Sequence, residues 1–390
     1  MSAPAVSEPA WLAGKRAAAR ERYDALPVPS NREEAWRYTN LRGFDPDAFT
    51  TGPSAVTLSE DELPDGVVFG SLARAAAEHP QLVERHYGAV VAEGEKFAAG
   101  NAARWDDGVF LHVAAGVEVD TPLRARLDVA GEGTAQYYRA LIVLEPGARA
   151  TFVEEFTSDA AGYLNVVVEL VIGDGAKLEY VTIQEHEHGT RQFGTHRATV
   201  GRDAELDWVA IGLGGTRAKS RMESYLADQG ANVKVTGAYF LRESEHADYD
   251  TTQEHAAPDT VSDLAFRGIL RDRATSVWSG MIKVDPGAQR TDAFQESRNL
   301  LLSDGSHADA IPGLEIEAND VRCTHAAAVA QIDREQLFYL RAHGLGLKQA
   351  QRLVIEGFLQ ELVERFPAGA LHDALSAALE RRLGAVLGAA

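Results

Sequence analysis

Cys323 and His325 are the residues of this 390-residue chain whose types and spacing point most directly to chemistry. They alternate with Thr324 in the segment 320–325, and residues two apart in a β-strand lie on the same face of a sheet. A thiolate and an imidazole on one face make half of a site for a soft metal. Two ligands are too few to hold iron or zinc tightly, so such a site needs further ligands from a second chain. A lone cysteine in a β-core is more often a small packing residue, and this alternative is favoured for Cys323.

Two other segments place histidines among acidic residues. Residues 185–188 read Glu-His-Glu-His, and in a strand His186 and His188 would face the same side and could share an ion. Gly189 follows and charges flank the segment, which favours a solvated turn. The second run holds His246, Asp248, Thr251, Thr252 and His255. Histidines paired with acids can bind metals, but a long turn in which these side chains satisfy backbone groups is favoured there.

A glycine-rich stretch at 212–220 resembles a phosphate-binding loop in composition. The loop motif requires glycine immediately before the lysine, and here Ala218 precedes Lys219. Leu213 occupies the position of the first required glycine. We therefore predict a glycine-rich turn and no nucleotide site in this chain.

Composition excludes several functional classes. The formal net charge of −20 argues against binding nucleic acid or an anionic membrane surface, both of which need basic side chains. One cysteine permits neither an intramolecular disulfide nor a four-cysteine metal site, and suits a reducing compartment. Because we find no transmembrane-length apolar run and no signal-peptide pattern, we expect a cytoplasmic protein.

Helical patterns dominate the first hundred residues. A weak apolar stripe predicts a helix over 8–26, and a second helical region covers 70–104. Ser30 and Glu33 have the spacing of a capping box, which predicts a helix start before residues 34–41. Residues 42–68 lack periodicity and are predicted to form a long connection.

Strand patterns begin near residue 108 and share a repeated turn. The alternating segments with β-branched and aromatic residues are 109–113, 140–144, 165–172, 178–183 and 233–236. Each turn of the repeat places an alanine at the same point: Ala148, Ala176, Ala204 and Ala231, in steps of 28, 28 and 27 residues. Ala274 and Ala288 continue the pattern at a spacing of 14 residues, half the longer period. Strands that repeat without intervening helices favour stacked β-coils over a β-sandwich with similar hairpins.

A helical period returns after Asp333, which can cap a helix over 334–342 that Gly344 ends. A second helix at 347–366 places Leu353, Phe358, Leu362 and Phe366 on one stripe, and a third covers 371–387. The predicted architecture is mainly β. An N-terminal helical region (1–105) precedes a β-helix core (106–332) and a C-terminal helical region (333–390).

Several motifs in the second half of the chain follow one another at the spacing of a known family. These are 289–295 (QRTDAFQ), 299–303 (NLLLS), 312–325 (PGLEIEANDVRCTH), 331–333 (QID) and 337–340 (LFYL), together with 34–41 (EAWRYTNL) near the N-terminus. On these residues the chain resembles the SufB/SufD family of the SUF iron–sulfur cluster assembly machinery, on its SufD side. The similarity is strongest over roughly 255–366.

The resemblance implies a right-handed parallel β-helix flanked by helical segments. It also implies a non-enzymatic scaffold that pairs with a SufB-like scaffold and binds two copies of a SufC-like ATPase. The helices near 333–366 would dock the ATPase, with Phe338, Phe358 and Leu362 as the contact residues. A transient iron–sulfur cluster would form at the interface with the SufB-like chain, and this chain alone would hold no cofactor.

The resemblance also assigns residues. His325 matches the SufD histidine proposed to contribute to cluster assembly, as a metal ligand at the interface, and Cys323 matches its accompanying cysteine. SufB-like chains carry a cysteine just before the Leu-Leu motif, whereas Ser297 stands near that place here. After His325 the family commonly has Gly-Ala-Thr-Val-Gly, but this chain departs from it at three positions: Ala326, Ala328 and Ala330.

Three alternatives remain open at this point. The chain could be a SufB-like scaffold, a β-helix carbohydrate-active enzyme with paired carboxylates in a groove, or a purely structural solenoid. If the chain is a SufD-like scaffold, we expect His325 on the surface that faces the partner. We also expect exposed strand edges or apolar patches near 290–340 and around the helix with Phe358 and Leu362.

Overall fold

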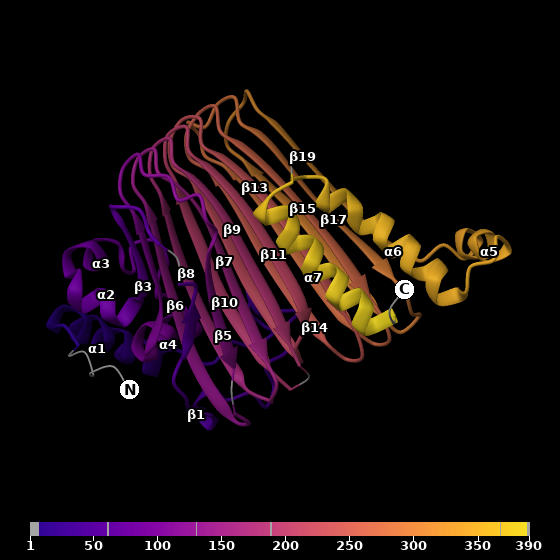
Figure 1. Cartoon of the computed structure of the whole chain (residues 1–390), viewed down its shortest axis with the longest axis horizontal. Helices are drawn as coiled ribbons and strands as arrows, with labels where there is room; N and C mark the ends of the chain where they lie inside the picture. Colours follow the sequence, from indigo (N-terminus) through magenta and orange to yellow (C-terminus); the bar gives the residue numbers. More distant parts are fainter. Residues whose placement is uncertain (1–7, 61, 130, 188, 367, 388–390) are drawn as a thin grey trace.

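Two long sheets wind into a parallel β-helix with helices at both ends (Figure 1). The structure, a computed structural model, describes residues 8–387 except 61, 130, 188 and 367. The 10-stranded sheet has the order β18-β16-β14-β12-β10-β8-β6-β4-β3, with β1 paired to β6, and the 9-stranded sheet has the order β19-β17-β15-β13-β11-β9-β7-β5-β2. From β4 onward, successive strands thus alternate between the two sheets, and each pair of strands forms one coil.

The elements have the following bounds. The helical segments are α1 (Ala10–Ala25), the 3₁₀ turns Glu34–Trp36 and Pro46–Ala48, α2 (Leu72–Glu78), α3 (Pro80–His86), α4 (Lys96–Arg104), α5 (Arg334–Ala342), α6 (Leu347–Val363) and α7 (Ala370–Leu387). The first sheet contains β1 (Thr50–Thr51), β3 (Val67–Ser71), β4 (Asp107–Val113), β6 (Thr134–Leu144), β8 (Tyr163–Ile172), β10 (Arg191–Val200), β12 (Arg217–Leu226), β14 (His246–His255), β16 (Thr275–Val284) and β18 (His307–Ile316). The second contains β2 (Val56–Leu58), β5 (Leu123–Val129), β7 (Arg149–Ser158), β9 (Lys177–His186), β11 (Glu205–Gly214), β13 (Asn232–Leu241), β15 (Val261–Leu270), β17 (Asp292–Leu301) and β19 (Arg322–Gln331).

The repeated alanines occupy equivalent turn positions, as predicted. Each donates its backbone N–H to the carbonyl three residues earlier, and each is buried: Ala148 (3.0 Å), Ala176 (3.0 Å), Ala204 (3.3 Å), Ala231 (3.3 Å), Ala274 (3.1 Å) and Ala288 (3.0 Å). Ala274 lies at the opposite corner of the coil, which explains the half-period. Parallel pairing from β4 to β19 excludes the sandwich and confirms the predicted β-helix.

Three clusters of apolar side chains stabilise this architecture. The largest fills the lumen between the two sheets. A second packs α6 and α7 against the outer face of the second sheet, where Figure 1 shows them crossing β9 to β15. A third packs the N-terminal segment, including Trp36 and Trp105, against the outer face of the first sheet.

Some local predictions need correction. The connection predicted over 42–68 contains β1, β2 and the first two residues of β3, strands too short to leave a periodic pattern. The Ser30 backbone N–H does donate to the Glu33 carboxylate (2.9 Å), but only a 3₁₀ turn follows. On α6, the stripe predicted to join Leu353 with Leu362 is wrong: Leu353 is 49% exposed, because it lies on the opposite side of the helix from the buried Ile355 and Leu362.

Candidate functional site

The C-terminal end of the β-helix is an open edge. Within the described residues β18 pairs only with β16, and β19 only with β17, so each leaves one row of backbone groups unpaired. Apolar side chains line this edge: Ile311, Leu314, Ile316 and Val329 are 37–44% exposed. The prediction of exposed strand-edge and apolar surface near 290–340 is therefore confirmed. Edges and patches of this kind characterise protein interfaces.

His325 lies on the inner face of β19, at the mouth of the lumen. In the parallel register His325 neighbours Gln295 of β17. The Gln295 side chain points into the lumen, where its amide Nε2 donates to the Gly280 and Gly313 carbonyls of the opposite sheet (3.3 and 3.0 Å). Whereas Gln295 is fully buried, His325 is exposed, since no further coil covers it in the described structure. The imidazole is thus outside the apolar core, as predicted, and is open to a second chain.

Cys323 occupies the same face of β19 but a different environment. It neighbours Ala293 in the register and packs partly buried against a small apolar cluster that includes Ile282 and Val284. Burial, helped by the charge of Asp292, raises the pKa of the Cys323 thiol, which disfavours the thiolate that would bind a metal. These contacts support a packing role for Cys323.

The residues that depart from the family motif fit a regular strand. Residues 322–331 pair with β17 without interruption, and Ala326, Ala328 and Ala330 are exposed. None of the three has a positive φ. Alanine is therefore compatible with the backbone here, and the loss of the two glycines leaves no strain in the strand.

Ser297 lies inside the β-helix rather than at the open edge. It is fully buried on β17, next to Ala327 in the register, and its Oγ accepts a hydrogen bond from Asn299 Nδ2 (3.4 Å). A hydroxyl in this position cannot provide the soft sulfur ligand that a cysteine would.

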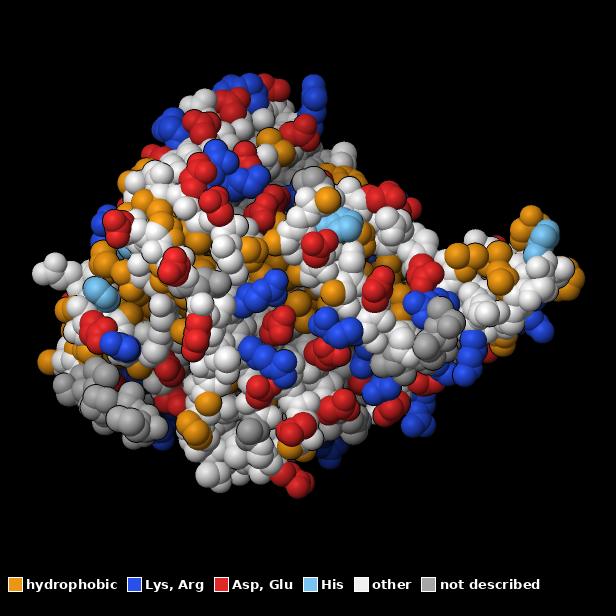
Figure 2. Space-filling view, viewed as in Figure 1, with side chains coloured by type: hydrophobic (Ala, Val, Ile, Leu, Met, Phe, Trp, Pro, Cys, Tyr) orange, Lys and Arg blue, Asp and Glu red, His pale blue; other side chains and the backbone are white. Residues whose placement is uncertain are grey.

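The C-terminal helices present a second exposed apolar surface. Figures 1 and 2 show α5 projecting from the body, with hydrophobic side chains on the projection. Phe338 and Tyr339 are 74% and 62% exposed, and Leu347 at the start of α6 is 48% exposed. In contrast, Leu362 is fully buried against the β-helix, so the expectation of exposed surface at this residue is wrong, because α6 uses this face to pack on the sheet.

A network of ion pairs fixes α6 beside the strands of the open end. The buried guanidinium of Arg267 on β15 contacts Glu296 on β17 (2.6 Å) and Glu361 on α6 (2.9 Å). The half-buried ring of Phe358 lies 5.8 Å from the same guanidinium. Phe358 therefore helps to hold α6 against the sheet and also borders the exposed surface of that helix.

The other histidine clusters have structural partners. His186 ends β9 and is buried, with Nε2 2.7 Å from Gln192 Oε1, so the solvated turn predicted there is wrong at this residue. His188 lies outside the described residues. Of residues 212–220, only 215 and 216 form a turn between β11 and β12, and the rest belong to those two strands. No group of three or more metal-binding side chains occurs among the residues that the structure describes.

The run 246–255 is strand β14, not the predicted turn: its outward polar side chains His246 and Asp248 are covered by the N-terminal segment, and His255 faces the lumen. Thr39 Oγ1 donates to Asp248 (2.5 Å) and lies 3.2 Å from His246 Nε2. Asp248 also pairs with Lys219 (3.0 Å). These contacts anchor residues 34–41 on the outer face of the first sheet, a role that the sequence did not reveal because the partners are about 200 residues apart.

The comparisons with known proteins agree with this architecture. Residues 127–358 match the family model for the SufBD core domain of the SUF system for iron–sulfur cluster assembly, and residues 47–125 match the SufBD N-terminal region. The chain belongs to the SufBD family. The predicted family is therefore confirmed, and SufBD proteins take part in iron–sulfur cluster assembly.

Individual SufBD relatives align along nearly the whole chain. An iron–sulfur cluster assembly SufBD family protein of Mycobacterium tuberculosis is 32% identical over 92% of this chain and 90% of its own length. The iron–sulfur cluster assembly protein SufD of Bacillus subtilis is 29% identical over 96% of this chain and 95% of its own.

Among the described residues, none of the helices has the length and apolar character needed to span a membrane.

Proposed function

We propose that this chain is a non-enzymatic, SufD-like scaffold that contributes His325 to an iron–sulfur cluster assembly site shared with a SufB-like partner. The observation that carries the proposal is the exposed imidazole at an unpaired, apolar strand edge. A partner that covers β18 and β19 would bury the exposed apolar side chains and enclose His325 in the same step.

The chemistry of the edge suits a shared site. A neutral imidazole is a borderline-soft ligand and adds no charge to an anionic cluster. The raised thiol pKa of Cys323 and the buried Ser297 hydroxyl leave this chain without a reactive sulfur at the edge. Sulfur ligands would therefore come from the partner, which favours the SufD-like over the SufB-like assignment. The cluster is the cargo of the assembly and not a resident cofactor of this chain.

His325→Ala tests the ligand role, and His307→Ala is a matched control. Both histidines are exposed and lie on edge strands of the last coil, but His307 is on the outer face of β18. In complexes co-expressed with the partner chains, we expect iron and acid-labile sulfide to fall severalfold in His325→Ala and to stay unchanged in His307→Ala, with co-purification intact in both. Normal cluster content in His325→Ala would reject the ligand role and favour a structural solenoid.

We also propose that a SufC-like ATPase docks on α5 and the exposed start of α6. Phe338, the most exposed large apolar side chain among the described residues, would be the main contact, with Phe358 as a further contact along α6 and Leu362 holding the helix in place. Phe338→Ala should weaken ATPase binding about tenfold or more, as for an exposed aromatic anchor. Leu63→Ala, a change at an exposed residue remote from these helices, should have no effect. Equal binding by both variants would contradict the docking assignment.

A further inference from the structure

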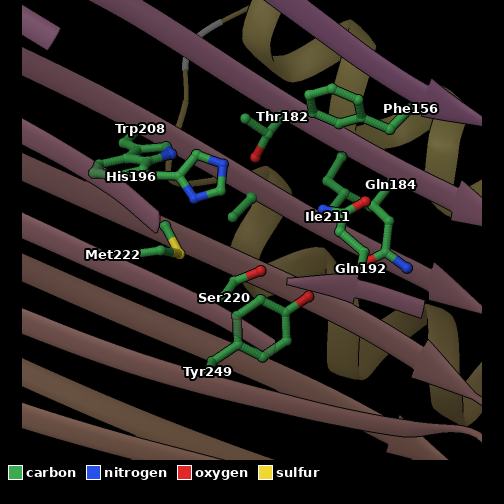
Figure 3. Close-up of a pocket in the computed structure, with 11 residues that line it drawn as sticks. Phe156, Thr182, Gln184, Gln192, His196, Trp208, Ile211, Ser220, Met222 and Tyr249 are labelled. Atoms are coloured by element: carbon green, nitrogen blue, oxygen red, sulfur yellow. The ribbon is translucent and has the colours of Figure 1, made fainter. Parts of the chain in front are cut away.

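A small cavity with a mixed polar and apolar lining lies inside the β-helix, between strands β7 and β14 (Figure 3). Its volume is about 20 Å³, counted as the space open to the centre of a water molecule. Strands of both sheets line it, and the lining includes His196, Trp208, Ser220 and Tyr249. A cavity of this size holds one water molecule and excludes substantially larger ligands.

Two glycines make room for the side chains around the cavity. A Cβ atom at Gly194 would lie 2.8 Å from His196 Cε1, and a Cβ atom at Gly212 would lie 2.0 Å from Tyr249 Oη. Any other residue at these two positions would push the ring or the hydroxyl away. The arrangement is therefore a specific feature of this part of the lumen.

Two buried nitrogen atoms at the cavity have unmet hydrogen-bonding capacity. His196 Nδ1 and Trp208 Nε1 lie on side chains that are only 5% and 1% exposed, and neither atom has a partner among the described residues. The two rings are neighbours, with centroids 6.1 Å apart, and Figure 3 shows them side by side at one end of the cavity. An unsatisfied buried polar group is costly, so native proteins usually supply a partner, often an ordered water.

We propose that one ordered water molecule resides in this cavity and bridges His196 Nδ1 and Trp208 Nε1. The indole N–H can only donate, so the water accepts from Trp208. The water then donates to His196 Nδ1 and has the Ser220 hydroxyl as a further possible partner on the lining. Burial keeps the imidazole neutral and able to accept, and the desolvated site excludes an ion of either sign.

A crystal structure of the full chain at a resolution that shows ordered water tests this proposal directly. We expect a single peak within hydrogen-bonding distance of both His196 Nδ1 and Trp208 Nε1. An empty cavity, or side chains rearranged so that both nitrogens bond to protein atoms, would overturn the proposal.

A pair of variants supplies an independent measurement. Trp208→Phe and Trp278→Phe each remove an indole N–H that is buried and unpartnered by the described residues, but Trp278 does not line the cavity. If water accepts from Trp208, the unfolding equilibrium constant should rise about fivefold more in Trp208→Phe than in Trp278→Phe, the usual effect of one hydrogen bond. Equal changes in both variants would count against the bridging water.

Discussion

The two ends of the β-helix are built differently. At the N-terminal end, β3 pairs antiparallel with β4 and β2 with β5, so that short strands cover the edges of the first coil. Helices α2 to α4 pack beside them, and the buried indole of Trp105 donates to the Tyr87 hydroxyl (2.8 Å). At the C-terminal end, β18 and β19 have neither a covering strand nor a covering helix among the described residues.

Under the proposed scaffold function, the chain itself completes the N-terminal end, and a partner would cover the C-terminal end. Exposed parallel edges are an aggregation risk, and proteins normally cover, shorten or charge them. Here the N-terminal edge is covered, whereas the C-terminal edge carries apolar side chains and His325. Substitutions at the covered end should therefore affect folding, and substitutions at the open end should affect association.

The largest effect is expected at the covered end, for Glu169→Ala. The fully buried Glu169 carboxylate pairs with Arg139 (2.5 Å) and accepts three backbone N–H groups, those of Gly88, Val90 and Val91 (3.0–3.2 Å). Its removal leaves a buried guanidinium without its counter-ion and three backbone donors unsatisfied. We expect a loss of about 3–5 kcal/mol in the free energy of unfolding, measured by chemical denaturation.

Glu315→Ala is the corresponding change at the open end. Glu315 is exposed on β18, so its removal should alter stability by less than about 0.5 kcal/mol. Similar losses for Glu169→Ala and Glu315→Ala would mean that the two ends do not differ in the way proposed.

A second pair of variants compares the two faces of α6. Leu362 is fully buried against the second sheet, whereas Leu353 is 49% exposed. Leu362→Ala should cost about 2–4 kcal/mol because it leaves a cavity in a packed cluster. Leu353→Ala should cost less than about 0.5 kcal/mol. Thermal or chemical unfolding would measure both, and a large loss in Leu353→Ala would show that its side chain is covered in the isolated chain.

The sequence contained enough information for the solenoid but not for the contacts between distant segments. The alanine repeat predicted equivalent corners because a tight turn recurs in every coil and tolerates only a small side chain there. The alternation of Cys323 and His325 placed both on one face, as β19 shows. A local pattern could not reveal that residues 34–41 cover β14, since that contact depends on packing between segments about 200 residues apart.

Exposure at the candidate site was similarly hard to predict. Leu353 and Leu362 are nine residues apart, about 180° around an α-helix, so the helical period itself puts them on opposite faces, and the single stripe predicted for them was wrong. His325 was assigned through family resemblance, and only the three-dimensional arrangement shows that the last coil leaves it uncovered. The polar run 246–255 was mistaken for a turn because β14 carries polar side chains on both faces: His246 and Asp248 lie under a covering segment, whereas His255 faces the lumen.

The buried histidines make the closed lumen sensitive to acid. His255 lies between Thr260 Oγ1 (2.8 Å) and Ser262 Oγ (2.9 Å), and burial lowers its pKa from 6.5 to about 4. Because the folded pKa lies below the unfolded one, the neutral ring stabilises the fold above pH 6.5, and this stabilisation is lost as the pH falls towards 4. At pH 5 the loss from this residue should be about 2 kcal/mol relative to pH 7.5.

His255→Gln should remove that contribution. The difference in unfolding free energy between pH 7.5 and pH 5 should become smaller than in the unaltered chain by about 2 kcal/mol. The comparison with the unaltered chain is needed because Glu154 also titrates in this pH range. Glu154 is buried between the Tyr138 and Tyr180 hydroxyls, and burial raises its pKa to about 7, so its contribution to stability increases as the pH falls. An unchanged pH dependence in His255→Gln would show that His255 does not titrate on unfolding.

The smallest effect on stability is expected at the open edge, for Val329→Asp. Val329 is 44% exposed on the inner face of β19, so an aspartate there remains solvated in the isolated chain and should change stability by less than about 0.5 kcal/mol. Binding of a scaffold partner over this edge would bury the charge without a counter-ion, and the affinity should fall at least tenfold. Thr324→Asp places the same charge on the opposite face of the same strand and should weaken binding much less. Titration with the partner would measure the affinity of both variants. A larger loss in Val329→Asp would place the interface over the mouth of the lumen, whereas equal losses would place it along the whole strand edge.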